Sequence, residues 1–574
     1  MRPVGGALLA LAAALFSQLQ PGAGLQTWQP IRHLEKQIQS GPSLSAHGHD
    51  IADEYPEYPA HVLRVPIDHF HNDSLYEPHV DGHFDLRYWF DDRHYRPGGP
   101  VIVLAAGETS GADRLPFLRK GIAAQLAAAT HGLAVILEHR YYGASFPLSD
   151  LSTASLRFLR TEQALADTAY FARHVRFPGL AHTTPGSDAP WIIYGGSYAG
   201  AFAAFARILY PDVFWGAISS SGVTVAIYDY WQYFEAQRLF SPPACVNTTQ
   251  TLIHAVDQIL RPAGKQQRRH ANQQPLRALQ DELGELTSDH VTTLKTLFNL
   301  ANVTHDDDFA ALLSEGLAGW QDTNWDPAVS SPSFGWYCGN VTADTLLFPE
   351  LEASRSVATT LLAATTYSHE AATLADALLN FAGWVRATFQ CADGRTQDQC
   401  FSNRNATFYR QDDLSQHWRA WPYQYCTQWG YLATGSGVPN DRLPLISRLL
   451  DLEYLSIICR DAFGITGPPD VESVNRLGGF DIQYPRLAIV DGEADPWRAA
   501  TPHALVGAKD RPSTTDEPFW LIGGGAVHHW DENGLLPDET SADLPPQPIL
   551  DVQAEEVRFV KAWVDEWTAQ KSSL

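Results

Sequence analysis

Short, continuously apolar stretches recur along the first half of the chain and predict buried strands. Residues 101–105, 133–137 and 191–194 are apolar without interruption, which is typical of parallel strands covered on both faces. Residues 160–173 and 201–209 carry apolar side chains at helical spacing beside these strands. Strands that alternate with helices favour a parallel α/β sheet.

This alternation is interrupted in the middle of the chain and resumes near the C-terminus. The middle part is richer in helical patterns, for example at 281–300 and 371–389. Strand-like runs return at 486–490 and 519–522, followed by a helix that closes the chain. We therefore predict an α/β core that is interrupted by a mainly helical insertion. The apolar face predicted for the closing helix is Val557, Val560, Val564 and Trp567.

The run G-G-S-Y-A-G at residues 195–200 lies between a predicted strand and a predicted helix. A serine on such a turn is typical of a nucleophile elbow, because the turn is too tight for large neighbours. The oxygen of Ser197 would project above the sheet, and the backbone N–H of Tyr198 would face a developing oxyanion. We expect a second oxyanion donor in the loop after residues 101–105, near Gly107 and Glu108.

An elbow serine needs a histidine base and an acid that orients the histidine. In α/β hydrolases the three follow in the order serine, acid, histidine, with the last two after late strands. Two late predicted strands supply both residue types in that order, and spacing does not choose among them. The candidates are Asp491, Glu493 and Asp495 for the acid, and His528 and His529 for the base.

Elbow, order and strand pattern together predict an α/β-hydrolase core with a mainly helical, disulfide-stapled cap. The predicted divisions are residues 59–224 and 476–574 for the core and 225–475 for the cap.

Composition narrows the possible partners. The formal net charge is −25, from 65 acidic and 40 basic residues, so the surface repels phosphate backbones and no nucleic acid partner is expected. After the first 24 residues no segment is apolar for long enough to span a membrane, and no membrane partner is predicted. No histidine or cysteine cluster has zinc-ligand spacing, so the sequence predicts neither a metal nor a cofactor.

The N-terminus indicates export. Residues 1–24 combine Arg2, an apolar stretch at 6–16 and small residues at 22–24, which is the pattern of a secretory signal peptide. An even number of cysteines suits an exported chain with three disulfides, and six cysteines allow 15 pairings. The cysteines are Cys245, Cys338, Cys391, Cys400, Cys426 and Cys459. The N-glycosylation sequons begin at Asn72, Asn247, Asn302, Asn340 and Asn405.

Several longer motifs resemble those of the S28 serine peptidases, which include lysosomal prolyl carboxypeptidase, dipeptidyl peptidase II and fungal secreted prolyl peptidases. The resemblance covers most of the chain outside the cap. The motifs are V-P-I-D-H-F at 65–70, E-H-R-Y-Y-G at 138–143, L-R-F-L-R-T-E-Q-A-L-A-D at 156–167, G-G-S-Y at 195–198, C-T-Q at 426–428, D-P-W at 495–497 and H-H at 528–529.

The resemblance implies a role for individual residues. Ser197 matches the nucleophile, Asp495 the acid and His528 the base. It also implies cleavage of peptide or protein substrates on the carboxyl side of proline through an acyl-enzyme. Trp497 is similar to an aromatic residue that lines the proline pocket. Carboxypeptidase, dipeptidyl-peptidase and endopeptidase modes all remain open.

Cysteine pairing is also predicted with the resemblance in view. Cys391 and Cys400 enclose eight polar or small residues, a compact loop, and Cys426 and Cys459 each have a family-like context. We predict the pairs 391–400, 426–459 and 245–338. One departure from the family is the segment after His529, which reads W-D-E-N without the arginine that is often found there.

Two other functions use the same sequence features. One is a secreted carboxylesterase, because the same three side chains serve ester and amide bonds. The other is a non-catalytic glycoprotein that binds peptides. A serine carboxypeptidase family with glutamate before the serine fits less well, since that residue here is Gly196. The expected location is extracellular, with a vacuole or lysosome-like compartment as the alternative.

Overall fold

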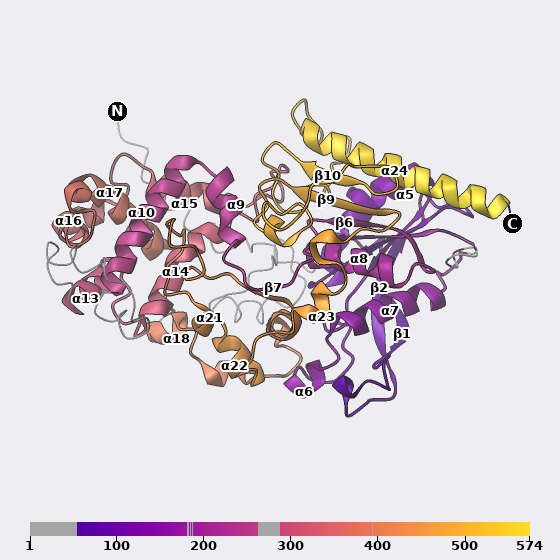
Figure 1. Cartoon of the computed structure of the whole chain (residues 1–574), viewed down its shortest axis with the longest axis horizontal. Helices are drawn as coiled ribbons and strands as arrows, with labels where there is room; N and C mark the ends of the chain where they lie inside the picture. Colours follow the sequence, from indigo (N-terminus) through magenta and orange to yellow (C-terminus); the bar gives the residue numbers. More distant parts are fainter. Residues whose placement is uncertain are drawn as a thin grey trace.

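The chain forms two lobes, one built on a sheet and one built of helices (Figure 1). The computed structural model describes residues 54–573 apart from 181–182, 184, 186–187, 262–287 and 393. The predicted signal peptide, residues 1–24, lies outside the described residues. Within the described ranges, no helix has both the length and the apolarity to cross a membrane.

The core is an eight-stranded sheet in the order β1-β2-β4-β3-β5-β6-β9-β10. β2 pairs antiparallel with β1 and β4. The remaining neighbours in the sheet, β4-β3-β5-β6-β9-β10, are parallel to one another. This is the sheet of an α/β hydrolase, which confirms the predicted fold class. The strands are β1 (His61–Pro66), β2 (His83–Asp91), β3 (Val101–Ala105), β4 (Leu133–Leu137), β5 (Trp191–Gly196), β6 (Phe214–Ser220), β9 (Leu487–Gly492) and β10 (Phe519–Ile522).

Helices cover both faces of this sheet. Successive residues of β3 alternate between two cores: Val103 packs in the larger core and Ile102 in the smaller one, as the pleat of a strand requires. The larger core contains the buried faces of α7 (Thr161–His174) and α8 (Tyr198–Leu209). The smaller core is closed by α5 (Ile122–Thr130) and α24 (Gln547–Ser572).

The closing helix α24 buries a face that overlaps the predicted one but is centred on two aromatic residues. Phe559, Val560 and Trp563 are buried, whereas Trp567 is only half-buried. The large rings of Phe559 and Trp563, 4.7 Å apart between centroids, take the central position because they bury more apolar surface than valines do. Val557 and Val564 therefore lie at the border of the core.

Helices make up most of the second lobe (Figure 1). The predicted helix at 371–389 is α17, and the described part of the one at 281–300 is α13. The longer helices of this lobe are α9 (Tyr233–Phe240), α10 (Pro243–Leu260), α13 (Ser288–Leu297), α14 (Asp306–Ala318), α15 (Ser333–Val341), α16 (Arg355–Ala363), α17 (Ala371–Thr388) and α22 (Ile457–Phe463), with the short α18 (Gln397–Phe401) and α21 (Leu452–Leu455) between them.

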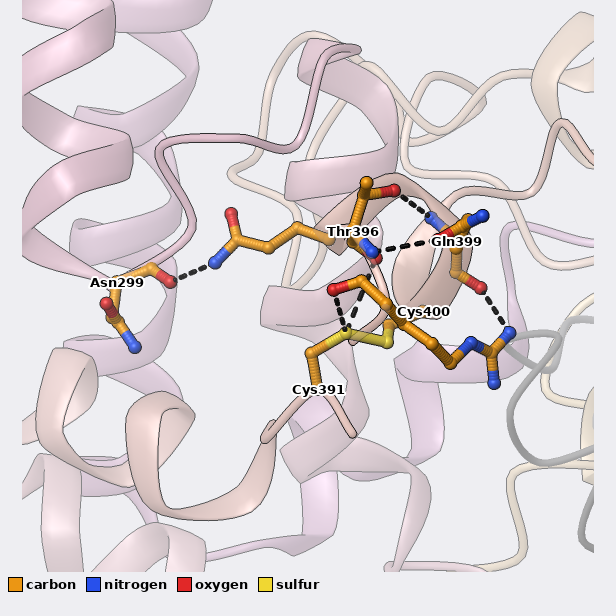
Figure 2. The surroundings of a disulfide bond; sticks show 7 residues. Asn299, Cys391, Thr396, Gln399 and Cys400 are labelled. Atoms are coloured by element: carbon orange, nitrogen blue, oxygen red, sulfur yellow. Dashed lines mark hydrogen bonds between the residues drawn. A yellow bond between two sulfur atoms is a disulfide. The ribbon is translucent and has the colours of Figure 1, made fainter. Parts of the chain in front are cut away.

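Three disulfides hold this lobe together. They join Cys245 to Cys338, Cys391 to Cys400, and Cys426 to Cys459, the same pairs that the sequence analysis predicts. Figure 2 shows the Cys391–Cys400 loop, in which Thr396 caps α18 and exchanges hydrogen bonds with Gln399. Each disulfide contributes about 2–4 kcal/mol when it constrains the unfolded chain.

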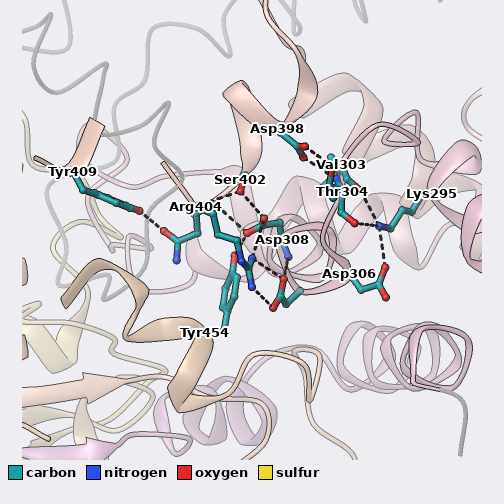
Figure 3. A network of polar contacts seen from close by, with 12 residues as sticks. Lys295, Val303, Thr304, Asp306, Asp308, Asp398, Ser402, Arg404, Tyr409 and Tyr454 are labelled. Atoms are coloured by element: carbon teal, nitrogen blue, oxygen red, sulfur yellow. Dashed lines mark hydrogen bonds and ion pairs between the residues drawn. The ribbon is translucent and has the colours of Figure 1, made fainter. Parts of the chain in front are cut away.

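A buried carboxylate at the start of α14 ties three segments of this lobe to one another (Figure 3). Asp308 is 0% exposed. It accepts hydrogen bonds from Ser402 Oγ (2.7 Å), from the backbone N–H of Asn403 (3.0 Å) and from the hydroxyl of Tyr454 (3.0 Å). Arg404 adds an ion pair at 3.1 Å. The paired charge is the condition under which a carboxylate can be buried.

Candidate active site

Ser197 lies on the turn between β5 and α8 in a conformation that few residues adopt. Its φ is 62° and its ψ is −126°, a region that costs backbone energy and is found at functional turns. Two glycines make the turn possible. A Cβ on Gly195 would lie 1.9 Å from the carbonyl oxygen of Ala199, and one on Gly200 would lie 2.7 Å from that of Ser220.

The structure brings Ser197, His528 and Asp495 together. His528 Nε2 lies 2.8 Å from Ser197 Oγ, and His528 Nδ1 lies 2.8 Å from Asp495 Oδ2. The other oxygen of Asp495 accepts the backbone N–H of Trp497 at 2.8 Å. The three groups form one hydrogen-bonded chain at the carboxyl ends of β5, β9 and β10, where parallel strands bring sequence-distant loops to one edge.

The competing candidates have other partners. Asp491 Oδ2 lies 2.6 Å from Nδ1 of His503, and Glu493 accepts the backbone N–H of Gly525 at 2.7 Å. His529 Nδ1 lies 2.8 Å from Oε2 of Glu532. The segment W-D-E-N after His529 lacks the arginine that is often found in the family, and its Glu532 pairs with His529.

The predicted oxyanion loop lies against the first turn of α8. Gly107 has a φ of 72°, and a Cβ there would lie 3.1 Å from Cβ of Ala199. The loop that carries Gly107 and Glu108 is therefore next to the elbow. The side chain of Tyr198 points away into the core, where its hydroxyl lies 3.0 Å from Nε2 of His139.

Trp497 belongs to a cluster of aromatic rings beside the base. It is 1% exposed, and its ring centroid lies 6.4 Å from that of His528. Tyr230 stacks on it at 5.4 Å, while Tyr233 and Tyr431 meet it edge-on at 5.2 and 5.1 Å. The indole contributes to an apolar enclosure of the imidazole and is at the same time a core residue.

A cap segment that the sequence analysis does not single out holds both late loops. The indole N–H of Trp320 donates to the carbonyl of Ala494 at 2.9 Å, and that of Trp325 donates to the carbonyl of Trp530 at 2.8 Å. Gln321 Oε1 accepts the indole N–H of Trp497 at 2.7 Å. The available signal was a polar run between two tryptophans, W-Q-D-T-N-W-D at 320–326, inside a mainly helical region.

Burial changes the acid–base properties of the site. It lowers the pKa of His528, and the charge of Asp495 opposes that shift, so burial favours the neutral imidazole, the form that can take up a proton. Burial raises the pKa of Glu108 to about 7 and that of Asp322, in the cap segment, to about 7. Burial also favours neutral His529, but Glu532 outweighs it and raises the pKa of His529.

The E-H-R-Y-Y-G motif forms a polar framework behind the elbow. Arg140 is 0% exposed and forms an ion pair with Asp167 of α7 at 2.5 Å. Glu138 pairs with Arg87 of β2 at 2.5 Å and accepts the backbone N–H of Gly111 at 2.9 Å. The motif thus connects β2, helix α7 and the segment that follows the Gly107 loop.

Two buried carboxyl groups, those of Asp531 and Glu556, lie behind the loop that carries His528. Asp531 accepts hydrogen bonds from the hydroxyls of Tyr194 (2.7 Å) and Ser220 (2.5 Å). Glu556 of α24 is 0% exposed, and burial together with the charge of Asp531 raises its pKa well above the ordinary value. Folding therefore favours the protonated form of Glu556.

The raised pKa of Glu556 predicts that the free energy of unfolding falls as the pH rises. A raised folded-state pKa contributes stability below about pH 4.5 that is lost as the pH rises. Each pH unit changes the free energy of unfolding by up to about 1.4 kcal/mol per carboxyl. We expect Glu556→Gln to flatten the decline and to stabilise the protein at pH 7, measured by denaturant unfolding at several pH values. Glu555→Gln, on the outer side of α24, is the control, and equal slopes for both variants would contradict the prediction.

Fold and elbow define an α/β hydrolase with a serine at the nucleophile position. Residues 66–313 match the serine carboxypeptidase S28 family. The chain is 50% identical over 541 residues to a probable extracellular serine carboxypeptidase of Arthroderma benhamiae, covering 93% of this chain and 71% of the relative. It therefore belongs to the S28 family and is a serine peptidase.

More distant relatives are also serine proteases by name. Serine protease vicPa of Bipolaris victoriae is 29% identical, with 77% of this chain and 80% of that protein covered. The thymus-specific serine protease of Mus musculus is 29% identical, with 81% and 82% covered.

Proposed function

We propose that this chain is a secreted, N-glycosylated serine peptidase that cleaves on the carboxyl side of proline, with Ser197, His528 and Asp495 as its triad. The observation that carries the proposal is the hydrogen-bonded chain from Ser197 Oγ through His528 to Asp495, at 2.8 Å for each link. Residues 225–475 act as the cap, since Trp320 and Trp325 hold the acid and base loops.

In the proposed mechanism His528 acts first as base and then as acid. His528 Nε2 takes the proton of Ser197 Oγ while that oxygen attacks the substrate carbonyl carbon. Asp495 keeps the proton of the imidazole on Nδ1 and stabilises the imidazolium. The backbone N–H of Tyr198 and the Gly107 loop stabilise the oxyanion. His528 then gives its proton to the leaving amine, and water releases the acyl group from Ser197 by the same two steps.

The extracellular part of the proposal has three supports. The A. benhamiae relative is named a probable extracellular serine carboxypeptidase. Three disulfides are the mark of an oxidising compartment. The sequon residues Asn72, Asn247 and Asn302 are exposed, while Asn340 and Asn405 are half-buried.

The proposed preference for proline gives the test of this function. An apolar aromatic enclosure can select the proline ring by contact, without the backbone N–H that proline lacks. We expect Pro-X bonds to be cleaved about 10- to 200-fold faster than Ala-X bonds, because alanine fills less of an apolar pocket. Mass spectrometry of fragments from a peptide library measures the ratio and shows which end of the substrate is released.

Two controls make this test specific. Trp497→Phe keeps a ring in the enclosure but loses the indole N–H to Gln321, and we expect it to reduce the Pro-to-Ala ratio more than it reduces hydrolysis of a short acyl ester. Cleavage of Leu-X or Lys-X as fast as Pro-X would contradict the proline preference and leave the triad untouched. Ester hydrolysis without any peptide cleavage would favour the carboxylesterase alternative.

A further inference from the structure

The connection between β1 and β2 carries a cluster of metal-ligating side chains that the proposed peptidase mechanism does not use. Asp68, His71 and His79 each contribute one ligand atom, and these atoms all lie within 4.8 Å of one another. Two imidazole nitrogens and one carboxylate oxygen are a donor set that suits Zn²⁺ and neighbouring divalent transition metals. The three residues come together through the fold of the loop.

Asp68 is fixed in place by the core. Its side chain is 0% exposed, and its Oδ1 accepts hydrogen bonds from the backbone N–H of Phe70 (2.9 Å) and from Nε2 of Gln163 on α7 (2.7 Å). Its Oδ2 lies 2.7 Å from Nδ1 of His79. One carboxylate oxygen is thus anchored to the helix while the other faces the imidazole.

His71 is the most exposed member of the cluster. Its side chain is 49% exposed, and its ring centroid lies 5.5 Å from that of His79. Ligand atoms around a tetrahedral Zn²⁺ lie about 3.3 Å apart, given bonds of about 2.0–2.1 Å. The wider separations in the cluster would therefore close by up to about 1.5 Å, while Asp68 Oδ2 and His79 Nδ1, now 2.7 Å apart, would separate slightly. An exposed imidazole can make this movement, and Asp81 Oδ1, 3.9 Å from His71 Nδ1, can then orient the ring, as carboxylates around zinc ligands do.

We propose that Asp68, His71 and His79 bind a divalent transition metal ion, with Zn²⁺ as the typical occupant. The ion would connect the β1–β2 loop to α7 through Asp68 and Gln163, and would stabilise the folded chain because it binds that state preferentially. The proposed triad contributes no ligand to this cluster. The ion would therefore have a structural role, and this proposal does not depend on the proposed peptidase activity.

The test uses the untagged full-length protein after treatment with a chelator. Isothermal titration with ZnCl₂ should give one equivalent of binding, and ZnCl₂ should raise the melting temperature. His71→Ala and His79→Ala should each weaken binding at least about tenfold, since even loss of an outer partner costs 10- to 100-fold. His83→Ala is the matched control, an exposed histidine at the start of β2 outside the cluster, and should bind as the wild type does.

A second measurement reports on the ligands themselves. Co²⁺ in place of Zn²⁺ should give the visible absorption of a site with nitrogen and oxygen ligands, and the spectrum should be lost in His71→Ala. Failure of the wild-type protein to bind Zn²⁺ would overturn the proposal. Equal binding by His71→Ala and the wild type would also overturn it, because the ion would then occupy other groups.

Discussion

Replacement of Ser197 by alanine should lower peptide turnover by roughly 10⁴-fold or more while the chain still folds. The serine contributes little to packing beyond its Cβ, which alanine keeps, so the elbow and its hydrogen bond from Ser197 N to the carbonyl of Ser220 (2.9 Å) survive. Turnover of a Pro-X peptide measures the loss. Circular dichroism and the melting temperature test the fold, and labelling by a fluorophosphonate probe should disappear together with activity.

The histidine variants separate the two candidate bases. His528→Ala should cost about as much as Ser197→Ala, because the members of a triad act as a unit. His529→Ala should be milder, since the imidazole of His529 pairs with Glu532, whereas His528 is the histidine whose ring lies 2.8 Å from Ser197 Oγ. A crippled His529→Ala enzyme with a mildly affected His528→Ala enzyme would refute the assignment of the base.

Replacement of Arg140 by methionine should destabilise the fold by about 3–5 kcal/mol. Its guanidinium donates to both oxygens of Asp167, at 2.5 and 2.6 Å, and to the carbonyls of Ile67 and Phe158 at 3.1 and 2.9 Å. Methionine fills much of the volume but leaves Asp167 as a buried charge without its main partner. Urea unfolding of the purified variant measures the loss in the free energy of unfolding.

The matched control for this prediction is a surface ion pair of α7, the helix that carries Asp167. Arg173 pairs with Asp212 at 2.7 Å, but both side chains are largely exposed, by 43% and 68%. Solvent screens such pairs, so Arg173→Met should cost less than about 1 kcal/mol. If Arg140→Met costs no more than Arg173→Met, the framework behind the elbow does not have the stabilising role inferred from its geometry.

Features that depend on local pattern could be predicted from the sequence. The strands at 101–105, 133–137 and 519–522 have the same bounds in the structure. For the first two, every residue is buried, because continuous apolar runs favour a strand that is covered on both faces. The elbow at Ser197 was equally clear, since only small residues fit its turn and Gly195 would collide with Ala199 if it carried a Cβ.

Choices within one loop could not be made from spacing. Asp491, Glu493 and Asp495 lie within five residues at the end of one strand, and only the resemblance favours Asp495. The structure separates them by their partners: Asp491 pairs with His503, and Asp495 with His528. The direction of a side chain at the end of a strand depends on φ and ψ in the turn, which the hydrophobic pattern does not report.

The sequence by itself determined three features: the order of the serine, acid and histidine candidates after successive strands, the turn at the serine, and an α/β core with a helical insertion. Only the tertiary structure decided which distant groups meet. The tryptophans of 320–326 reach the acid and base loops from the cap. Helix α24 buries Phe559 and Trp563 beside Val560, and Asp68, His71 and His79 converge in one loop. The physical reason is that strands and turns follow from interactions between near neighbours, whereas these contacts join residues whose proximity exists only after the chain has packed.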